Sequence, residues 1–130
     1  MQFNPRSSTI HRQCCGLVLM LALLITCPSL AWGHAHPEQM IPESNATLQQ
    51  APEAVTIHFT EALEPAFSSI EVTGPQGQVV NQGDSHVAAD NPNVLVAPLK
   101  PLESGTYTVD WHVVARDGHT TEGEYTFQVQ

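Results

Sequence analysis

The chain contains no cysteine after residue 27. Cys14, Cys15 and Cys27 are its three cysteines, and all of them lie near the start of the 130-residue sequence. The segment from residue 34 onward therefore cannot form disulfides or use thiolate chemistry. Its 97 residues must be held by one packed core, which is feasible for a single domain of this size and leaves no room for a second.

Positive charge is also scarce in this segment. Lys100 and Arg116 are its only lysine and arginine, whereas all thirteen acidic residues of the chain lie within it, which gives a formal charge of −11. Such a surface repels nucleic acid and anionic lipid and mildly attracts cations. We therefore expect no nucleic-acid partner.

Signatures of common enzyme classes are missing as well. The sequence has no Gly-x-Ser-x-Gly elbow, no P-loop and no His-Glu-x-x-His motif. Aromatic residues after residue 33 are limited to Trp111, two tyrosines and three phenylalanines, so no extended aromatic platform for a substrate can be read. We therefore predict a protein that is not an enzyme.

The first 33 residues have the pattern of a secretory signal peptide. A start with arginine but no acid precedes an apolar run from Gly16 to Ile25, which is too short for a membrane span of about 20 residues. Ala31-Trp32-Gly33 is a small-x-small exit. We predict a cleaved signal peptide over residues 1–33 and a mature domain over residues 34–130 in the periplasm, without membrane insertion after cleavage.

Two other processing sites remain open. Gly33-His34-Ala35 is also small-x-small, and cleavage there would start the mature chain at His36. Leu24-Ile25-Thr26-Cys27 faintly resembles a lipoprotein processing site, although Thr26 stands where Gly or Ala is usual. Cleavage before Cys27 would leave that residue lipidated at the N-terminus. The mature N-terminal residue matters because it supplies a free amine.

Alternating apolar and polar residues predict β-strands in the mature domain. The predicted strands are an edge strand at 38–41, strands at 54–60 and 69–73, a return strand at 78–81 and a short strand at 94–98, with a polar loop over 82–93. No segment shows sustained helical periodicity, and strands recur at the roughly 8–12-residue spacing of a sandwich. The sequence predicts an all-β, Greek-key, immunoglobulin-like sandwich of about seven strands.

The C-terminal part of the chain predicts a long β-hairpin. On its first strand Tyr107, Val109, Trp111 and Val113 share one face, and we expect Trp111 to be the largest single burial of the core. The residues before Tyr107 resemble the corner that precedes the penultimate strand of an immunoglobulin-like sandwich. We expect the Tyr107 hydroxyl to bond upstream backbone there.

Histidine is enriched in the mature domain. Six of the seven histidines follow residue 33, namely His34, His36, His58, His86, His112 and His119. Imidazole is a common ligand for copper, zinc and nickel. His58, His86 and His112 also fit as ordinary polar strand or loop residues.

His34, Asp117 and His119 are candidates for one copper site. After cleavage at Gly33, His34 offers its α-amine and its Nδ1 as a chelating pair. In an extended chain Asp117 and His119 project to the same side, and they add an oxygen and a third nitrogen. This donor set suits the tetragonal preference of Cu(II). Asp-Gly is also a strong turn dipeptide, so the pattern alone leaves a plain hairpin turn open.

A second copper mode is open at the same N-terminus. His34-Ala35-His36 places a histidine third from the free amine. The amine, the deprotonated amides of Ala35 and His36 and the imidazole of His36 could bind Cu(II) without the rest of the domain. His36 is therefore an additional or alternative candidate ligand.

Several motifs occur together in an order typical of one family. They are His34-Ala35 with Pro42 eight residues on, Ile57-His58-Phe59-Thr60-Glu61-Ala62-Leu63 before Phe67, Pro98-Leu99-Lys100-Pro101-Leu102 leading to Gly105-Thr106-Tyr107-Thr108-Val109-Asp110-Trp111, and Asp117-Gly118-His119 followed by Gly123 and Phe127-Gln128-Val129. By these motifs the mature chain resembles, over essentially its whole length, the copper-resistance protein C (CopC) family of periplasmic copper-binding domains.

The resemblance implies a seven-stranded cupredoxin-like or immunoglobulin-like barrel that holds one Cu(II) through His34, Asp117 and His119. It implies copper sequestration, resistance or delivery, with an inner-membrane copper transporter of the CopD type as a candidate partner, and we expect a monomer. Some members carry a methionine-rich Cu(I) site in mid-chain. Residues 73–89 contain no methionine and Met40 is the only one after residue 33, so we expect no Cu(I) site.

Two residues depart from the family pattern. His112 stands where members commonly have arginine after the strand tryptophan, and His36 is an extra imidazole near the site.

Two other function classes also remain open, a copper oxygenase with a histidine brace and an exported interaction module whose histidines are incidental. Oxygen-dependent turnover would indicate the first, and failure to retain copper against a modest chelator would indicate the second.

Overall fold

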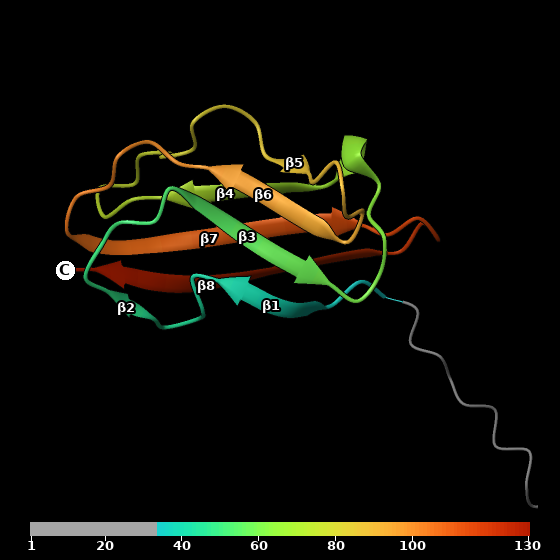
Figure 1. The fold of residues 1–130 in the computed structure, drawn as a ribbon, viewed down its shortest axis with the longest axis horizontal. Coiled ribbons are helices and arrows are strands. Elements are labelled where there is room, and N and C mark those ends of the chain that lie inside the picture. Colours follow the sequence, from blue (N-terminus) through green and yellow to red (C-terminus); the bar gives the residue numbers. More distant parts are fainter. Residues whose placement is uncertain (1–33) are drawn as a thin grey trace, which may run out of the picture. The chain divides into compact units, whose positions relative to one another are not determined.

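The computed structural model of the chain describes residues 34–130, which form two four-stranded β-sheets (Figure 1). The predicted signal peptide, residues 1–33, lies outside the described residues. The elements are β1 Pro37–Ile41, β2 Thr47–Leu48, β3 Ala54–Phe59, the short 3-10 turn η1 Pro65–Phe67, β4 Ser69–Thr73, β5 His86–Val87, β6 Val94–Pro98, β7 Gly105–Val114 and β8 Thr120–Val129. Between residues 34 and 130, no helix has the length and apolar character needed to cross a membrane.

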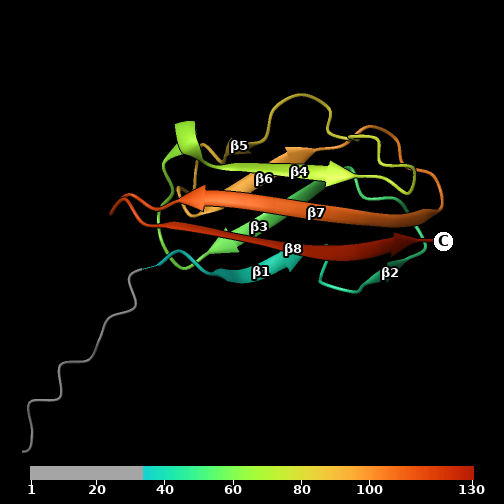
Figure 2. The ribbon, with the colours of Figure 1, turned by 180° about the vertical axis from the view of Figure 1, so that it is seen from behind.

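The strand order confirms the predicted sandwich. One sheet has the order β1-β3-β6-β5 and the other β2-β8-β7-β4. Most neighbouring strands are not consecutive in sequence, so the chain repeatedly crosses from one sheet to the other, as a Greek-key arrangement requires. Figure 2 shows the second sheet, with the long β7–β8 hairpin across its centre.

The structure contains two short strands, β2 and β5, that were not predicted. β2 and β5 have two residues each, which is too few for an alternation pattern to be visible. The predicted return strand over residues 78–81 is instead reduced to isolated bridges. There the Asn81 side chain replaces ladder bonds, because its Oδ1 accepts from Val72 N at 2.7 Å and its Nδ2 donates to Ile70 O at 2.9 Å.

The core lies between the sheets and is built from the apolar positions of the predicted strands. Its largest fully buried side chains include Phe59, Phe127 and Ile57. Trp111 was expected to supply the largest single burial of the core. The structure places its ring at the edge of the core, where it is only partly buried. The ring contacts Phe59 edge to face, with centroids 5.5 Å apart. It also covers Gly123, where a Cβ would lie 2.5 Å from a ring carbon of Trp111.

The predicted tyrosine corner is present. The Tyr107 hydroxyl donates to the Glu103 carbonyl at 2.8 Å, and the side chain is buried. We expect Tyr107→Phe to lower the free energy of unfolding by about 1 kcal/mol, the net value of one such bond. Urea unfolding followed by tryptophan fluorescence measures this. Tyr125→Phe is the matched control, because the buried Tyr125 hydroxyl has no hydrogen-bond partner; an equal loss in both variants would contradict the assignment.

The outer face of the second sheet carries a row of carboxylates. Glu71 lies opposite Asp110, and Asp110 lies opposite Glu124. Like charges directly opposite on neighbouring strands destabilise a sheet. We expect Asp110→Asn to raise the free energy of unfolding by about 0.2–1 kcal/mol at low salt, and the gain to vanish in 1 M salt, where charges are screened within about 3 Å. Asp90→Asn, in an exposed loop, should show no such gain in urea titrations; equal gains would exclude cross-strand repulsion as the cause.

Three parts of the chain meet at one end of the sandwich. They are the segment before β1, the end of β3 and the turn between β7 and β8 (Figures 1 and 2). β1 pairs with β3 so that Pro37 lies opposite Phe59. The Thr121 hydroxyl, at the start of β8, donates to the carbonyl of Ala35. This end carries the residues predicted to bind metal.

Candidate metal centre

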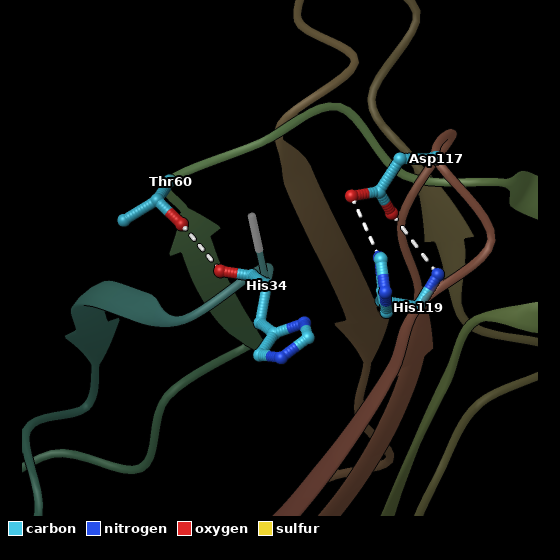
Figure 3. A network of polar contacts seen from close by, with 4 residues as sticks. All are labelled: His34, Thr60, Asp117 and His119. Atoms are coloured by element: carbon cyan, nitrogen blue, oxygen red, sulfur yellow. Dashed lines mark hydrogen bonds and ion pairs between the residues drawn. The ribbon is translucent and has the colours of Figure 1, made fainter. Parts of the chain in front are cut away.

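The structure brings His34 and His119 together although they are 85 positions apart. Their ring centroids are 4.6 Å apart and the ring planes are inclined by 66°. Figure 3 shows the rings near each other, with Asp117 beside His119 and Thr60 beside the main chain of His34. Two imidazoles bound side by side to one ion have ring centres roughly 4.5 Å apart, because metal–nitrogen distances are about 2 Å. The observed spacing therefore fits a shared metal ion.

The turn between β7 and β8 positions His119. Ala115 N donates to His119 O at 2.9 Å and Gly118 N donates to Ala115 O at 2.8 Å. Gly118 has φ = 88°, a left-handed conformation that favours glycine. Asp117-Gly118 is therefore part of a hairpin turn, as the dipeptide predicts, and the turn also fixes the position of the imidazole.

Asp117 and His119 come together through this turn. The expected reason, projection from an extended strand to the same side, is wrong, because residues 116–118 form the turn itself. Asp117 Oδ1 accepts from His119 N at 3.0 Å, and Oδ2 lies 2.9 Å from His119 Nδ1. The backbone amide of His119, followed by its imidazole, holds the pKa of Asp117 below its usual value.

This contact decides which nitrogen of His119 faces a ligand. Because Nδ1 lies against the carboxylate, Nε2 is the nitrogen available to a metal. A carboxylate on the second ring nitrogen is the usual support of a metal-bound histidine, since it fixes the ring orientation and raises the basicity of the ligand. The His119 side chain is 56% exposed, so an ion can approach it from solvent.

His34 contributes a nitrogen with no protein partner. Its Nδ1 is buried and makes no hydrogen bond, a condition found among residues 34–130 at only one other side-chain atom, the Tyr125 hydroxyl. A buried polar atom left unpaired costs about 1–3 kcal/mol. A metal ion bound to Nδ1 would satisfy this atom, which supports His34 as a ligand.

Side chains alone do not complete the centre. Within residues 34–130, no group of three or more histidine, cysteine, aspartate or glutamate side chains is arranged to hold a metal ion. The side-chain hydrogen bonds of Asp117 go to His119. The remaining donor in the predicted set is the α-amine of His34, which exists only after the chain is cut before this residue.

The other histidines lie elsewhere or are differently oriented. His36 is exposed, and its ring centroid is 6.3 Å from that of His34. His58, His86 and His112 belong to β3, β5 and β7, where they pair with neighbouring strands. This placement agrees with ordinary strand roles for these three residues.

Two threonines near the centre were not predicted. The Thr60 hydroxyl contacts the main chain of His34 and His36, and the Thr121 hydroxyl contacts that of Ala35. Thr60 shows in the sequence only as the polar end of a strand. Its role depends on which residues of β1 and β3 lie opposite each other, and this register is not visible in a local pattern.

The chain is similar to known proteins along the whole β-sandwich. The protein-family model described as CopC domain matches residues 38–130. Protein YobA of Escherichia coli (strain K12) is 41% identical over 115 residues, which cover 88% of this chain and 91% of that protein. Copper resistance protein C of Xanthomonas campestris pv. juglandis is 36% identical over 104 residues, covering 74% of this chain and 81% of that protein.

A solved structure shares the fold. The crystal structure of CopC from Methylosinus trichosporium OB3b superposes with a TM-score of 0.69 at 31% sequence identity. The match covers 75% of this chain and 94% of that one. At this identity and coverage the similarity extends to the whole described β-sandwich.

Proposed function

Because the chain belongs to the CopC domain family, we propose that it is a non-catalytic periplasmic protein that holds one Cu(II) ion at its processed N-terminus. A role in copper binding follows from the family and from relatives named for copper resistance. The single observation that carries the site is the buried, unpartnered Nδ1 of His34, with its ring 4.6 Å from that of His119.

The proposed ligands are three nitrogens and one oxygen. His34 provides its α-amine and Nδ1, and His119 provides Nε2. Asp117 provides an oxygen once its Oδ2 leaves Nδ1 of His119, because a carboxylate on Nδ1 lies on the side of the ring away from Nε2 and cannot also reach an ion there. Its Oδ1 can keep the hydrogen bond from the His119 amide. This set suits the tetragonal preference of Cu(II).

The scarcity of methionine after residue 33 supports copper in the Cu(II) state. Cu(I) prefers soft thiolate and thioether ligands. Met40 is the only methionine after residue 33, and it packs against the core from β1. No second sulfur can join it in the mature domain, which supports a Cu(II) site without a Cu(I) site.

The amide chelate formed by His34-Ala35-His36 is disfavoured by the contacts of these residues. That mode uses the amide nitrogens of Ala35 and His36. Ala35 is fully buried, and the His36 amide donates to the Thr60 hydroxyl at 3.0 Å. Both residues would have to leave their places before their nitrogens could bind copper.

We further propose that the protein delivers copper rather than storing it permanently. The 56% exposure of His119 leaves one ligand open to exchange with an acceptor. An inner-membrane copper transporter of the CopD type is the proposed acceptor, and the protein acts as a monomer exported by its signal peptide.

The proposal is tested with protein that begins at His34. Titration with Cu(II) against a competing chelator should show one tight equivalent, and this equivalent should persist in His58→Ala, which removes a histidine from β3. Failure to retain copper against a modest chelator would contradict the proposal and favour an interaction module. Oxygen-dependent turnover by the copper form would contradict its non-catalytic part.

A further inference from the structure

The three residues before β1 are held by side-chain hydroxyls. Thr60 Oγ1 accepts from His36 N at 3.0 Å and donates to His34 O at 3.2 Å. Thr60 N donates to His36 O at 2.9 Å. Thr121 Oγ1 donates to Ala35 O at 2.6 Å. All three carbonyls of the segment therefore accept a hydrogen bond from the domain.

Thr60 replaces main-chain pairing that the sheet cannot supply here. Pro37 has no N–H, and the register between β1 and β3 shifts between Pro37 and Gln39. The regular ladder is therefore interrupted just after the segment 34–36. A hydroxyl can accept from one main-chain group and donate to another, and Thr60 does both. Figure 3 shows the Thr60 hydroxyl directed at the His34 carbonyl.

We propose that Thr60 is a positioning residue that selects how copper is bound. This inference rests on the proposed function. By binding the His34 carbonyl, Thr60 holds the amine and the ring of His34 beside His119. By accepting the hydrogen bond of the His36 amide, it keeps that nitrogen from the metal. In the competing chelate the amide protons of Ala35 and His36 would leave to solvent as two nitrogen–copper bonds form.

Thr60→Val tests the proposal because it keeps the side-chain shape and removes the hydroxyl. We expect the variant to bind Cu(II) about 10- to 100-fold more weakly in the His34–His119 mode, the usual effect of losing a group that supports a ligand. The amide chelate should then appear, with the visible absorption band shifted to higher energy because deprotonated amides are strong-field ligands. Thr60→Ser should restore the wild-type spectrum, and Thr56→Val, on the strand β3 that ends just before Thr60, should leave it unchanged.

A double variant and the exchange rate of the His36 amide test the role of Thr60 further. In Thr60→Val combined with His36→Ala the spectral shift should be lost, because the chelate lacks its imidazole. In the wild-type protein the His36 amide should exchange with solvent more slowly than an unprotected amide, a result that does not depend on any variant. A wild-type spectrum in Thr60→Val, weaker binding without a shift, or unprotected exchange of the His36 amide would each overturn the role of Thr60.

The two hypotheses fail in different ways. If wild-type protein beginning at His34 does not bind one equivalent of Cu(II), the proposed function is wrong. If the wild type binds copper through His119 and Thr60→Val behaves identically, the proposed function stands and the positioning role of Thr60 is wrong.

Discussion

Protein acetylated on the α-amine of His34 is expected to bind Cu(II) more than ~100-fold more weakly than protein with a free amine there. Acetylation turns the α-amine into an amide and removes a ligand. Loss of a group that only supports a ligand already costs about 10- to 100-fold in metal affinity, so loss of the ligand itself should cost more. Competition titrations with a copper chelator measure the ratio.

Acetylation is used instead of an added residue for a chemical reason. The free amine of an added residue could chelate copper together with the amide and the imidazole of His34. The test uses Lys100→Arg, because Lys100 carries the only other amine in residues 34–130 of a chain that begins at His34, and unmodified Lys100→Arg is the control. Equal affinity with and without the acetyl group would show that the α-amine is not a ligand.

Replacing His119 is expected to have the second large effect. His119→Ala should lower Cu(II) affinity more than ~100-fold, because it removes the ligand that Asp117 holds in place. His36→Ala should change the affinity by only a few-fold, since the His36 ring is exposed and its amide is bonded to Thr60. Isothermal titration of both variants gives the comparison, and tryptophan fluorescence reports whether each is folded.

The two variants distinguish the His34–His119 site from the amide chelate, because each mode loses affinity in a different variant. Tight binding that survives His119→Ala and is lost in His36→Ala would show that copper uses the amide chelate. Both variants lie outside the apolar core, so neither result should arise from unfolding.

Much of the fold could be predicted because its signal is local. The alternation at residues 69–73 predicts β4 with the bounds that the structure has, and the run at 94–98 predicts β6 equally well. Tyr107 could be assigned its bond because the corner before it has a recognisable sequence and the bond spans four residues. In each case the information lies within about ten residues.

The features that were mispredicted depend on register or on turn geometry. Trp111 lies at the edge of the core, over Gly123, because these two residues are opposite each other in the β7–β8 ladder. The contacts of Thr60 depend on the pairing of β1 with β3. Asp117 holds His119 through hydrogen bonds of a tight turn rather than through strand alternation. Periodicity along one strand contains none of this information.

The candidate site could be predicted only in part. Chelation by an N-terminal histidine and resemblance to a family both pointed to His34, Asp117 and His119. Neither predicted that Asp117 would have both oxygens engaged by His119, or that a threonine would hold the main chain of His34. The sequence also could not predict that His119 is exposed while Nδ1 of His34 is buried, because both depend on how the two sheets pack.

The most direct test of a copper site made by cleavage is the mass of the mature protein. Intact-mass and N-terminal peptide measurements on the exported protein should give a chain of residues 34–130 with a free amine at His34. A chain that starts at His36 lacks the His34 ligand, and a lipidated chain that starts at Cys27 lacks the free amine beside it. Either of these results would contradict the account.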